Sequence, residues 1–184
     1  MTAPAGGRVS RPARRRALSI AAGVVLGAVL WLALTLTGGP GPHQAPAFSL
    51  PRLGGGPAVA YPVRGAEARR PVVLVFFASW CTPCRAELPA VARVADQVRG
   101  AGGHVLFLGV DGNDDPASGL SFARHSGVSF AVGADRDSSL APKFSLVGYP
   151  GTVFIDASGN VAGSVRGPVT RATLERWVSR LGAT

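Results

Sequence analysis

The chain has 184 residues, of which 47% are hydrophobic and 16% are charged, and its formal net charge is +9. This length fits one domain of ordinary size plus a short extension, and the composition excludes a disordered, highly charged chain. The two cysteines, Cys81 and Cys84, can build neither a disulfide-stapled mini-protein nor a four-cysteine zinc module. Five of the 19 basic residues precede residue 17 and the others are dispersed, which argues against nucleic-acid binding.

The N-terminal region has the pattern of a membrane anchor. Residues 1–16 contain the five clustered arginines, and residues 17–37 form a 21-residue stretch without charge or proline. As a helix this stretch would span about 30 Å, enough to cross a bilayer, and the arginines predict a cytoplasmic N-terminus. We therefore expect a single-pass cell-membrane protein with an extracytoplasmic catalytic domain. A cleaved secretory signal is the alternative, and twin-arginine export is a weaker one.

Residues 38–46 are rich in glycine and proline, which predicts a linker, and we expect the domain to occupy residues 47–184 after a loop-rich start. The apolar run 71–77 predicts a strand buried on both faces, and apolar spacings of three and four predict a helix from Cys84 to Gly100. The elements expected next are a strand at 105–110, a helix at 116–125, a short segment at 129–132 and a short helix at 138–144. A strand at 152–156 forming a hairpin with 161–166 and a helix at 170–181 are expected to follow. This alternation predicts an α/β layered domain.

Cys81 and Cys84 lie where the predicted strand ends and the helix begins. A thiol at a helix N-terminus faces unpaired backbone N–H groups and the positive end of the helix dipole, which favour the thiolate. We predict that Cys81 is the nucleophile and that Cys84, one turn later, is the resolving thiol. Two alternatives are an inert core pair and half of a zinc site completed by a histidine. Neither is favoured, because His43, His104 and His125 have no ligand spacing.

Residues 45–181 resemble the membrane-tethered TlpA/ResA/CcmG group of extracytoplasmic thiol-disulfide oxidoreductases, which have a thioredoxin-like fold. The resemblance rests on the sequences APAFSL at 45–50, FFASWCTPCRAELP at 76–89, GYP at 148–150 and VFID at 153–156.

This resemblance implies a central mixed sheet flanked by helices and a redox-active disulfide with no other cofactor. It also implies supporting roles for Trp80 and Pro83, a cis Pro150 against the disulfide, and a substrate-binding backbone at Tyr149.

The chain departs from related patterns at two positions. Gly151 stands where the group often has threonine, which we expect to loosen the loop after Pro150. Val75 stands where classical thioredoxin has a buried aspartate that takes the proton of the second cysteine. Glu87, which matches a glutamate of the group's motif and shares a helix face with Cys84, is the candidate replacement. The alternative is a solvated glutamate paired with an arginine.

Residues 111–115 (DGNDD) resemble the start of a calcium loop, but Pro116 and Phe122 occupy the positions of its glycine and its bidentate glutamate. We therefore expect a polar loop beside the active site and no metal site.

Three functions remain open at this stage. The first, implied by the resemblance, is a reductant for exported proteins such as apocytochrome c during cytochrome maturation, supplied by a membrane thiol-electron donor of the DsbD/CcdA type. The second is an oxidant or isomerase in the folding of secreted proteins. The third is a dithiol copper chaperone. It is the weakest of the three, because Met1 is the single methionine and copper(I) prefers additional soft sulfur ligands.

Overall fold

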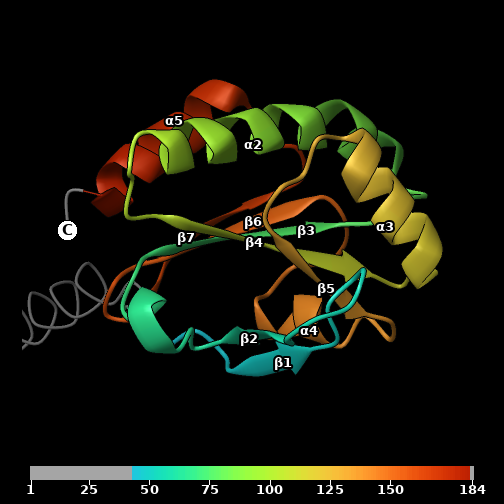
Figure 1. The fold of residues 1–184 in the computed structure, drawn as a ribbon, viewed down its shortest axis with the longest axis horizontal. Helices are drawn as coiled ribbons and strands as arrows, with labels where there is room; N and C mark the ends of the chain where they lie inside the picture. The colour runs from blue at the N-terminus through green and yellow to red at the C-terminus, as the bar shows by residue number, and fades with distance from the viewer. Residues whose placement is uncertain (1–42, 183–184) are drawn as a thin grey trace, which may run out of the picture. The chain divides into compact units, whose positions relative to one another are not determined.

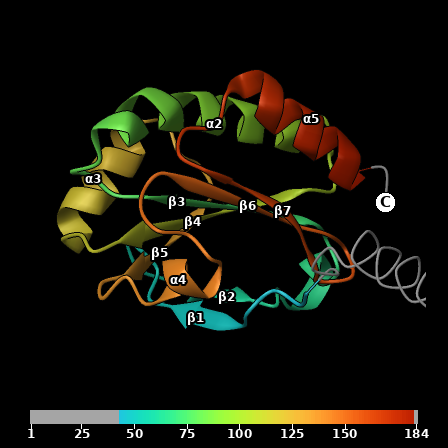
Figure 2. The same ribbon diagram turned by 180° about the vertical axis from the view of Figure 1, so that it is seen from behind.

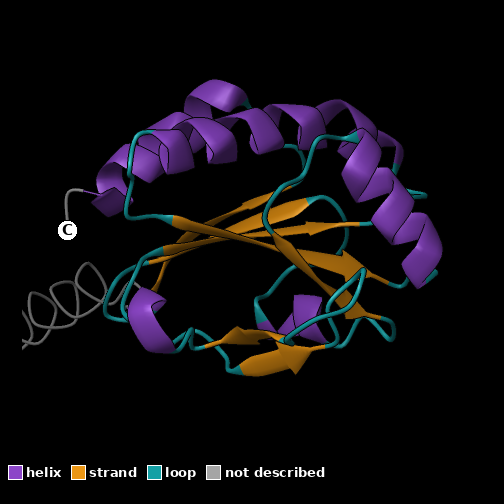
Figure 3. Cartoon of the chain, viewed as in Figure 1, coloured by secondary structure: helices purple, strands orange, loops and turns teal. Residues whose placement is uncertain are grey.

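The computed structural model describes residues 43–182. A five-stranded sheet forms the middle layer, in the order β5-β4-β3-β6-β7 (Figures 1 and 3). β3 is parallel to β4 and antiparallel to β6, β4 is parallel to β5, and β6 and β7 are antiparallel. The strands are β3 (Val72–Phe77), β4 (Leu106–Gly112), β5 (Ala131–Asp135), β6 (Gly151–Ile155) and β7 (Val161–Arg166).

Three longer helices cover one face of this sheet: α2 (Thr82–Gly100), α3 (Pro116–His125) and α5 (Arg171–Gly182). α2 and α5 lie side by side in both views (Figures 1 and 2). The opposite face carries α4 (Leu140–Lys143) and a small antiparallel sheet of β1 (Phe48–Leu50) and β2 (Val59–Tyr61). A 3-10 turn, η1 (Gly65–Glu67), precedes β3.

β3 is the centre of the core, since all six of its residues are buried. Its alternate side chains divide the core into two clusters, with Val75 and Phe77 in one and Leu74 and Phe76 in the other. A strand covered on both faces needs apolar residues at every position, which explains the uninterrupted apolar run in the sequence. The C-terminal end of β3 leads directly into the cysteine segment, so the most buried strand positions the candidate site.

The predicted mixed sheet flanked by helices is confirmed, including the β6–β7 hairpin. β1 and β2 lie in the segment expected to be loop-rich. β4 runs two residues beyond its expected end and takes in Asp111 and Gly112.

Gly151 does not begin a loosened loop, because it is the buried first residue of β6. A Cβ at this position would lie 2.8 Å from Leu146 Cδ1, so glycine makes room for the Leu146 side chain.

The predicted membrane-spanning segment, residues 17–37, lies outside the described residues. Within residues 43–182, no helix combines the length and the apolar character needed to cross a bilayer. The end of the expected linker contacts the domain: the Ala45 N–H donates to the Gly159 carbonyl at 2.9 Å, and Gln44 Nε2 donates to Asn160 Oδ1 at 2.8 Å.

Candidate active site

Cys81 and Cys84 form a disulfide at the N-terminus of α2, with their Cα atoms 5.3 Å apart. Cys81 is the N-cap residue, and the Cys84 backbone N–H donates to Cys81 Sγ at 3.2 Å. Both cysteines are buried, with exposed fractions of 4% for Cys81 and 1% for Cys84. A sulfur that accepts a hydrogen bond from the first turn of a helix is stabilised as a thiolate. This geometry can support thiol–disulfide exchange that starts at Cys81.

The segment ahead of Cys81 is held by the loop that follows β4. Ser79 donates two hydrogen bonds to the Asp114 carboxylate, one from its backbone N–H and one from its hydroxyl, the latter at 2.9 Å. Trp80 Nε1 donates to the Asn113 carbonyl at 2.9 Å. The expectation of a polar loop beside the cysteines is therefore confirmed for residues 113–115, whereas Asp111 and Gly112 belong to β4. Among residues 43–182, no group of three His, Cys, Asp or Glu side chains is placed to hold a metal ion.

A second loop approaches this segment through aromatic contact. The Tyr149–Pro150 peptide bond is cis, as the resemblance implied. The Tyr149 ring meets the Trp80 ring edge to face, with centroids 5.8 Å apart, and its hydroxyl is 2.7 Å from Ser138 Oγ. Trp80 is 54% exposed and Val147, two residues before Tyr149, is 95% exposed. Exposed apolar side chains of this kind suit contact with a polypeptide substrate.

Glu87 is buried on α2, one turn after Cys84. Its side chain is 6% exposed and neither carboxylate oxygen has a hydrogen-bond partner. Burial raises the pKa of Glu87 to about 7, although the Val169 backbone acts in the opposite direction. The alternative of a solvated glutamate paired with an arginine is therefore wrong. A carboxyl group with a pKa near neutrality can both accept and release a proton at physiological pH.

The position of the classical thioredoxin aspartate is occupied by Val75, which is 1% exposed. Its partner in the β3–β6 register is Thr152, whose hydroxyl is buried without a hydrogen-bond partner. No carboxylate can act from Val75, which leaves Glu87 as the buried acid on the cysteine helix.

Sequence reasoning missed Asp111. The sequence places it in a polar loop, but it is 1% exposed at the end of β4 and neither of its carboxylate oxygens has a partner. The register places it beside Phe77, four residues before Cys81. The signal in the sequence that could have identified Asp111 is that it directly follows the apolar run of β4, so a strand that continued by one residue would bury it.

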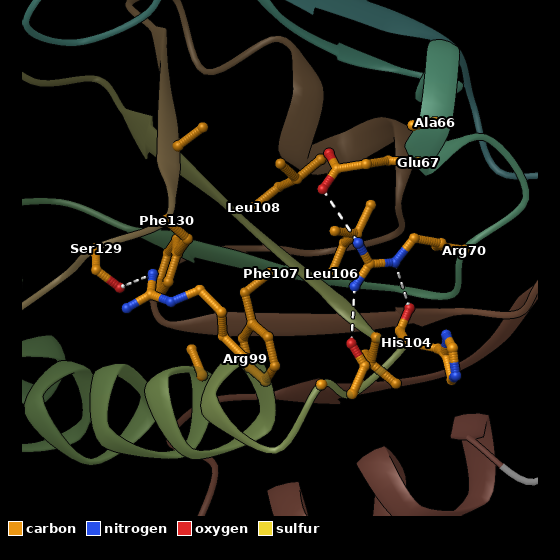
Figure 4. Close-up of a pocket in the computed structure, with 15 residues that line it drawn as sticks. Ala66, Glu67, Arg70, Arg99, His104, Leu106, Phe107, Leu108, Ser129 and Phe130 are labelled. Carbon is orange, nitrogen blue, oxygen red and sulfur yellow. Dashed lines mark hydrogen bonds and ion pairs between the residues drawn. The ribbon is translucent and has the colours of Figure 1, made fainter.

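A pocket of about 570 Å³ lies at the opposite end of α2 from the disulfide (Figure 4). Its two arginines already have partners: Arg70 donates to the His104 and Gly103 carbonyls and to Glu67, and Arg99 donates to Ser129. The lining of this pocket includes neither cysteine and neither of the buried acids Glu87 and Asp111, so the candidate active site is the disulfide end.

Two relatives that this chain matches are named as thiol-disulfide enzymes. ResA, a thiol-disulfide oxidoreductase of Bacillus thuringiensis subsp. konkukian, is 24% identical over 110 residues, 60% of this chain and 62% of its own length. The match thus spans slightly less than two thirds of that relative. The thiol:disulfide interchange protein HelX of Rhodobacter capsulatus is 26% identical over 141 residues, 75% of this chain and 74% of HelX.

The solved structure of MTB dsbF is 32% identical, covers 73% of this chain and 94% of its own, and superposes with a TM-score of 0.63. The family model that matches is the AhpC/TSA family, over residues 42–164. This match takes in the cysteine pair, the polar loop, cis Pro150 and all five strands of the central sheet except the last two residues of β7. With its thioredoxin-like fold and its redox-active cysteine pair in place of a separate cofactor, the chain belongs to the AhpC/TSA family.

Proposed function

We propose that the protein is a membrane-anchored thiol-disulfide oxidoreductase that reduces disulfides of exported proteins. The observation that carries this proposal is the hydrogen bond from the Cys84 N–H to Cys81 Sγ at the helix N-terminus. It favours a thiolate on Cys81, and a thiolate is the attacking species in disulfide exchange. The names of ResA and HelX support the same reaction class.

In the proposed reaction the reduced enzyme supplies two electrons. The Cys81 thiolate attacks a substrate disulfide, which forms a mixed disulfide and releases one substrate thiolate. Cys84, after losing its proton, attacks Cys81 Sγ, which closes the Cys81–Cys84 disulfide and releases the second substrate thiolate. Glu87 accepts the proton of Cys84, because it lies one turn further along the same helix face and has a pKa of about 7.

The substrate lies across the surface formed by the exposed Trp80 and by residues 147–150, the loop that contains cis Pro150 (the cis-proline loop). In this arrangement the backbone of Tyr149 binds an extended substrate segment next to Pro150, and Pro83 keeps the first turn of α2 rigid because its φ is fixed. An extended segment is the form that an incompletely folded exported protein, such as apocytochrome c, would present. We propose that a membrane thiol-electron donor of the DsbD/CcdA type re-reduces the pair.

The direction of the reaction is tested by the reduction potential. Equilibrating the protein in glutathione or dithiothreitol buffers is expected to give a value near that of thioredoxin, about −270 mV. A value near that of DsbA, about −120 mV, together with disulfide formation in a reduced unfolded protein, would contradict a reductive role and support oxidative folding.

The location is tested separately. Protease added to intact, wall-stripped cells should digest the domain, because the arginines before residue 17 keep the N-terminus inside. A protected cytoplasmic domain, or a mature protein starting near Gly38, would contradict the anchored topology.

A further inference from the structure

Asp111 is a buried acid that the proposed reaction does not use. It is the sixth residue of β4, it is 1% exposed, and neither of its carboxylate oxygens has a hydrogen-bond partner. The overlying helix α3 has a glycine at the point of contact, since a Cβ at Gly119 would lie 2.0 Å from Asp111 Oδ2. The fold therefore makes room for this carboxyl group but provides no donor for it as a carboxylate, which is costly inside a protein.

Asp114, three residues after Asp111, makes the contact that holds the residues just before Cys81. Asp114 is partly buried and accepts both the backbone N–H and the hydroxyl of Ser79. Ser79 is two residues before Cys81, and the Cys81 N–H in turn donates to the Ala78 carbonyl at 3.2 Å. The position of the attacking sulfur thus depends on where Asp114 holds Ser79.

The groups that face Asp111 are acids and a phenol. Asp114 and Asp115 approach it from the loop between β4 and α3. Tyr149, which precedes cis Pro150, is close enough for a charge on Asp111 to raise the pKa of its phenol. Burial, followed by the charge and hydrogen bonding of Asp114 and then the charge of Asp115, raises the pKa of Asp111 to about 8. Two carboxylates cannot hydrogen-bond to each other, but a protonated carboxyl group is a donor. A proton on Asp111 therefore gives its side chain a partner.

We propose that Asp111 is a positioning residue of the redox site: it stays protonated in the folded protein and donates a hydrogen bond to Asp114, which in turn holds Ser79 ahead of Cys81. Asp114 then accepts four hydrogen bonds: one from Asp111, two from Ser79 and one from the Asp115 backbone N–H. The inference deepens the proposed function and relies on it only for the consequence for Cys81.

The consequence is a pH-dependent clamp on the cysteine segment. When Asp111 loses its proton, the hydrogen bond to Asp114 is replaced by repulsion between two carboxylates in a partly buried site. Asp114 then moves away from Ser79, and the segment before Cys81 loosens. The added negative charge near the helix N-terminus also disfavours the Cys81 thiolate.

The test measures the clamp directly, without a substrate. Hydrogen exchange of the Ser79 amide would be followed by NMR in the full chain in detergent, from about pH 6 to about pH 9.5, and corrected for intrinsic base catalysis. The expected result is a roughly tenfold loss of protection across the titration of Asp111, the scale of one charge-assisted hydrogen bond. Titration of the Asp111 carboxyl carbon in the same samples should follow the same midpoint.

Three variants separate this role from a general effect on the fold. Asp111→Asn has an amide donor that cannot ionise, so it should keep the protection at every pH. Asp111→Leu removes the donor, so protection should be roughly tenfold lower throughout. Asp115→Asn is the matched control, because asparagine still caps α3 and Asp111 keeps its proton donor. It should show the same roughly tenfold fall in protection, with a midpoint at lower pH because the charge of Asp115 no longer raises the pKa of Asp111.

Protection that falls with pH in Asp111→Asn as it does in the wild type would overturn the proposal, as would an Asp111 carboxyl that titrates at the ordinary position. If Asp111→Leu does not fold, the wild type and Asp111→Asn still decide the question. A protein that lacked reductase activity but showed the expected Ser79 protection would refute the proposed function and leave the clamp intact.

Discussion

The two ends of helix α2 differ in how they use polar side chains. The N-terminal end carries the disulfide, and two buried acids without hydrogen-bond partners, Glu87 and Asp111, lie at the same end of the domain. At the C-terminal end a pocket of about 570 Å³ is lined by arginines whose hydrogen bonds are made within the fold. The pocket therefore lies at the end of α2 that lacks the disulfide and the unpartnered buried acids. Buried groups with unmet hydrogen-bonding capacity are the better indication of a functional site here.

The largest expected difference between the two ends follows from removing the first cysteine. Cys81→Ser should abolish disulfide exchange, because serine is not ionised at neutral pH and cannot form the mixed disulfide. The measurement is the rate of substrate disulfide reduction by the reduced variant. Arg99→Ala is the control from the other end of α2, and its rate should stay within about twofold of the wild type because an exposed ion pair contributes little. An active Cys81→Ser protein would contradict the account.

Glu87→Gln should slow the exchange between about tenfold and 100-fold at neutral pH, because glutamine cannot take the proton of Cys84. The measurement is the pH profile of single-turnover rates, in which a step near the pKa of Glu87, about 7, should disappear. Glu175→Gln on the exposed surface of α5 is the matched control. An unchanged profile in Glu87→Gln would show that Glu87 has no part in proton transfer.

Glu87 should also make stability depend on pH. Its pKa is raised from 4.5 to about 7 on folding, so between these values the folded state binds more protons than the unfolded state. The free energy of unfolding should therefore fall as pH rises through this window, by about 2 kcal/mol, and Glu87→Gln should flatten the fall. Urea unfolding of the oxidised protein at several pH values measures both. A free energy of unfolding that rose with pH in the wild type but not in Glu87→Gln would contradict a raised pKa for Glu87.

A smaller effect is expected at Trp80, which joins the cysteine segment to the cis-proline loop. Trp80→Ala removes the indole N–H bond to Asn113 and the ring contact with Tyr149, so KM for a protein substrate should rise about threefold to tenfold. Trp80→Phe keeps an aromatic ring but not the N–H, so its KM should lie between those of the wild type and Trp80→Ala. Equal KM values for Trp80→Ala and the wild type would exclude this surface from substrate binding.

The smallest effect on activity is expected at Arg70, beside the distal pocket. Arg70→Ala leaves the His104 and Gly103 carbonyls without their guanidinium donor, so the free energy of unfolding should fall by about 1–2 kcal/mol. The exchange rate should not change. A rate loss comparable to that of Glu87→Gln would mean that the two ends are coupled.

The sequence predicted most of the sheet and the cysteine junction for identifiable reasons. The run at 71–77 is apolar throughout because β3 is buried on both faces, and helix periodicity marks α2 after Cys84. β1 and β2 were missed because each has three residues and they lie among glycines and prolines, which predict loops.

The chemistry of the buried acids was harder to predict. Spacing places Glu87 on the face of Cys84, but spacing does not state how deeply that face is covered, so a solvated glutamate remained open. The sequence pattern around Asp111 predicts a polar loop, because its burial depends on Gly119, eight residues further along the chain. The polarity of a residue is visible in a sequence, whereas the partners it lacks are visible only in three dimensions.

The most direct test of the central claim, that Cys81 attacks and Cys84 resolves, is to trap the mixed disulfide. Cys84→Ser and Cys81→Ser would each be incubated with a disulfide-containing exported protein, and the covalent products would be mapped by mass spectrometry. The account predicts that Cys84→Ser accumulates a complex joined through Cys81, because nothing resolves it, and that Cys81→Ser traps little. Accumulation through Cys84 in the Cys81→Ser protein, with none through Cys81, would contradict it.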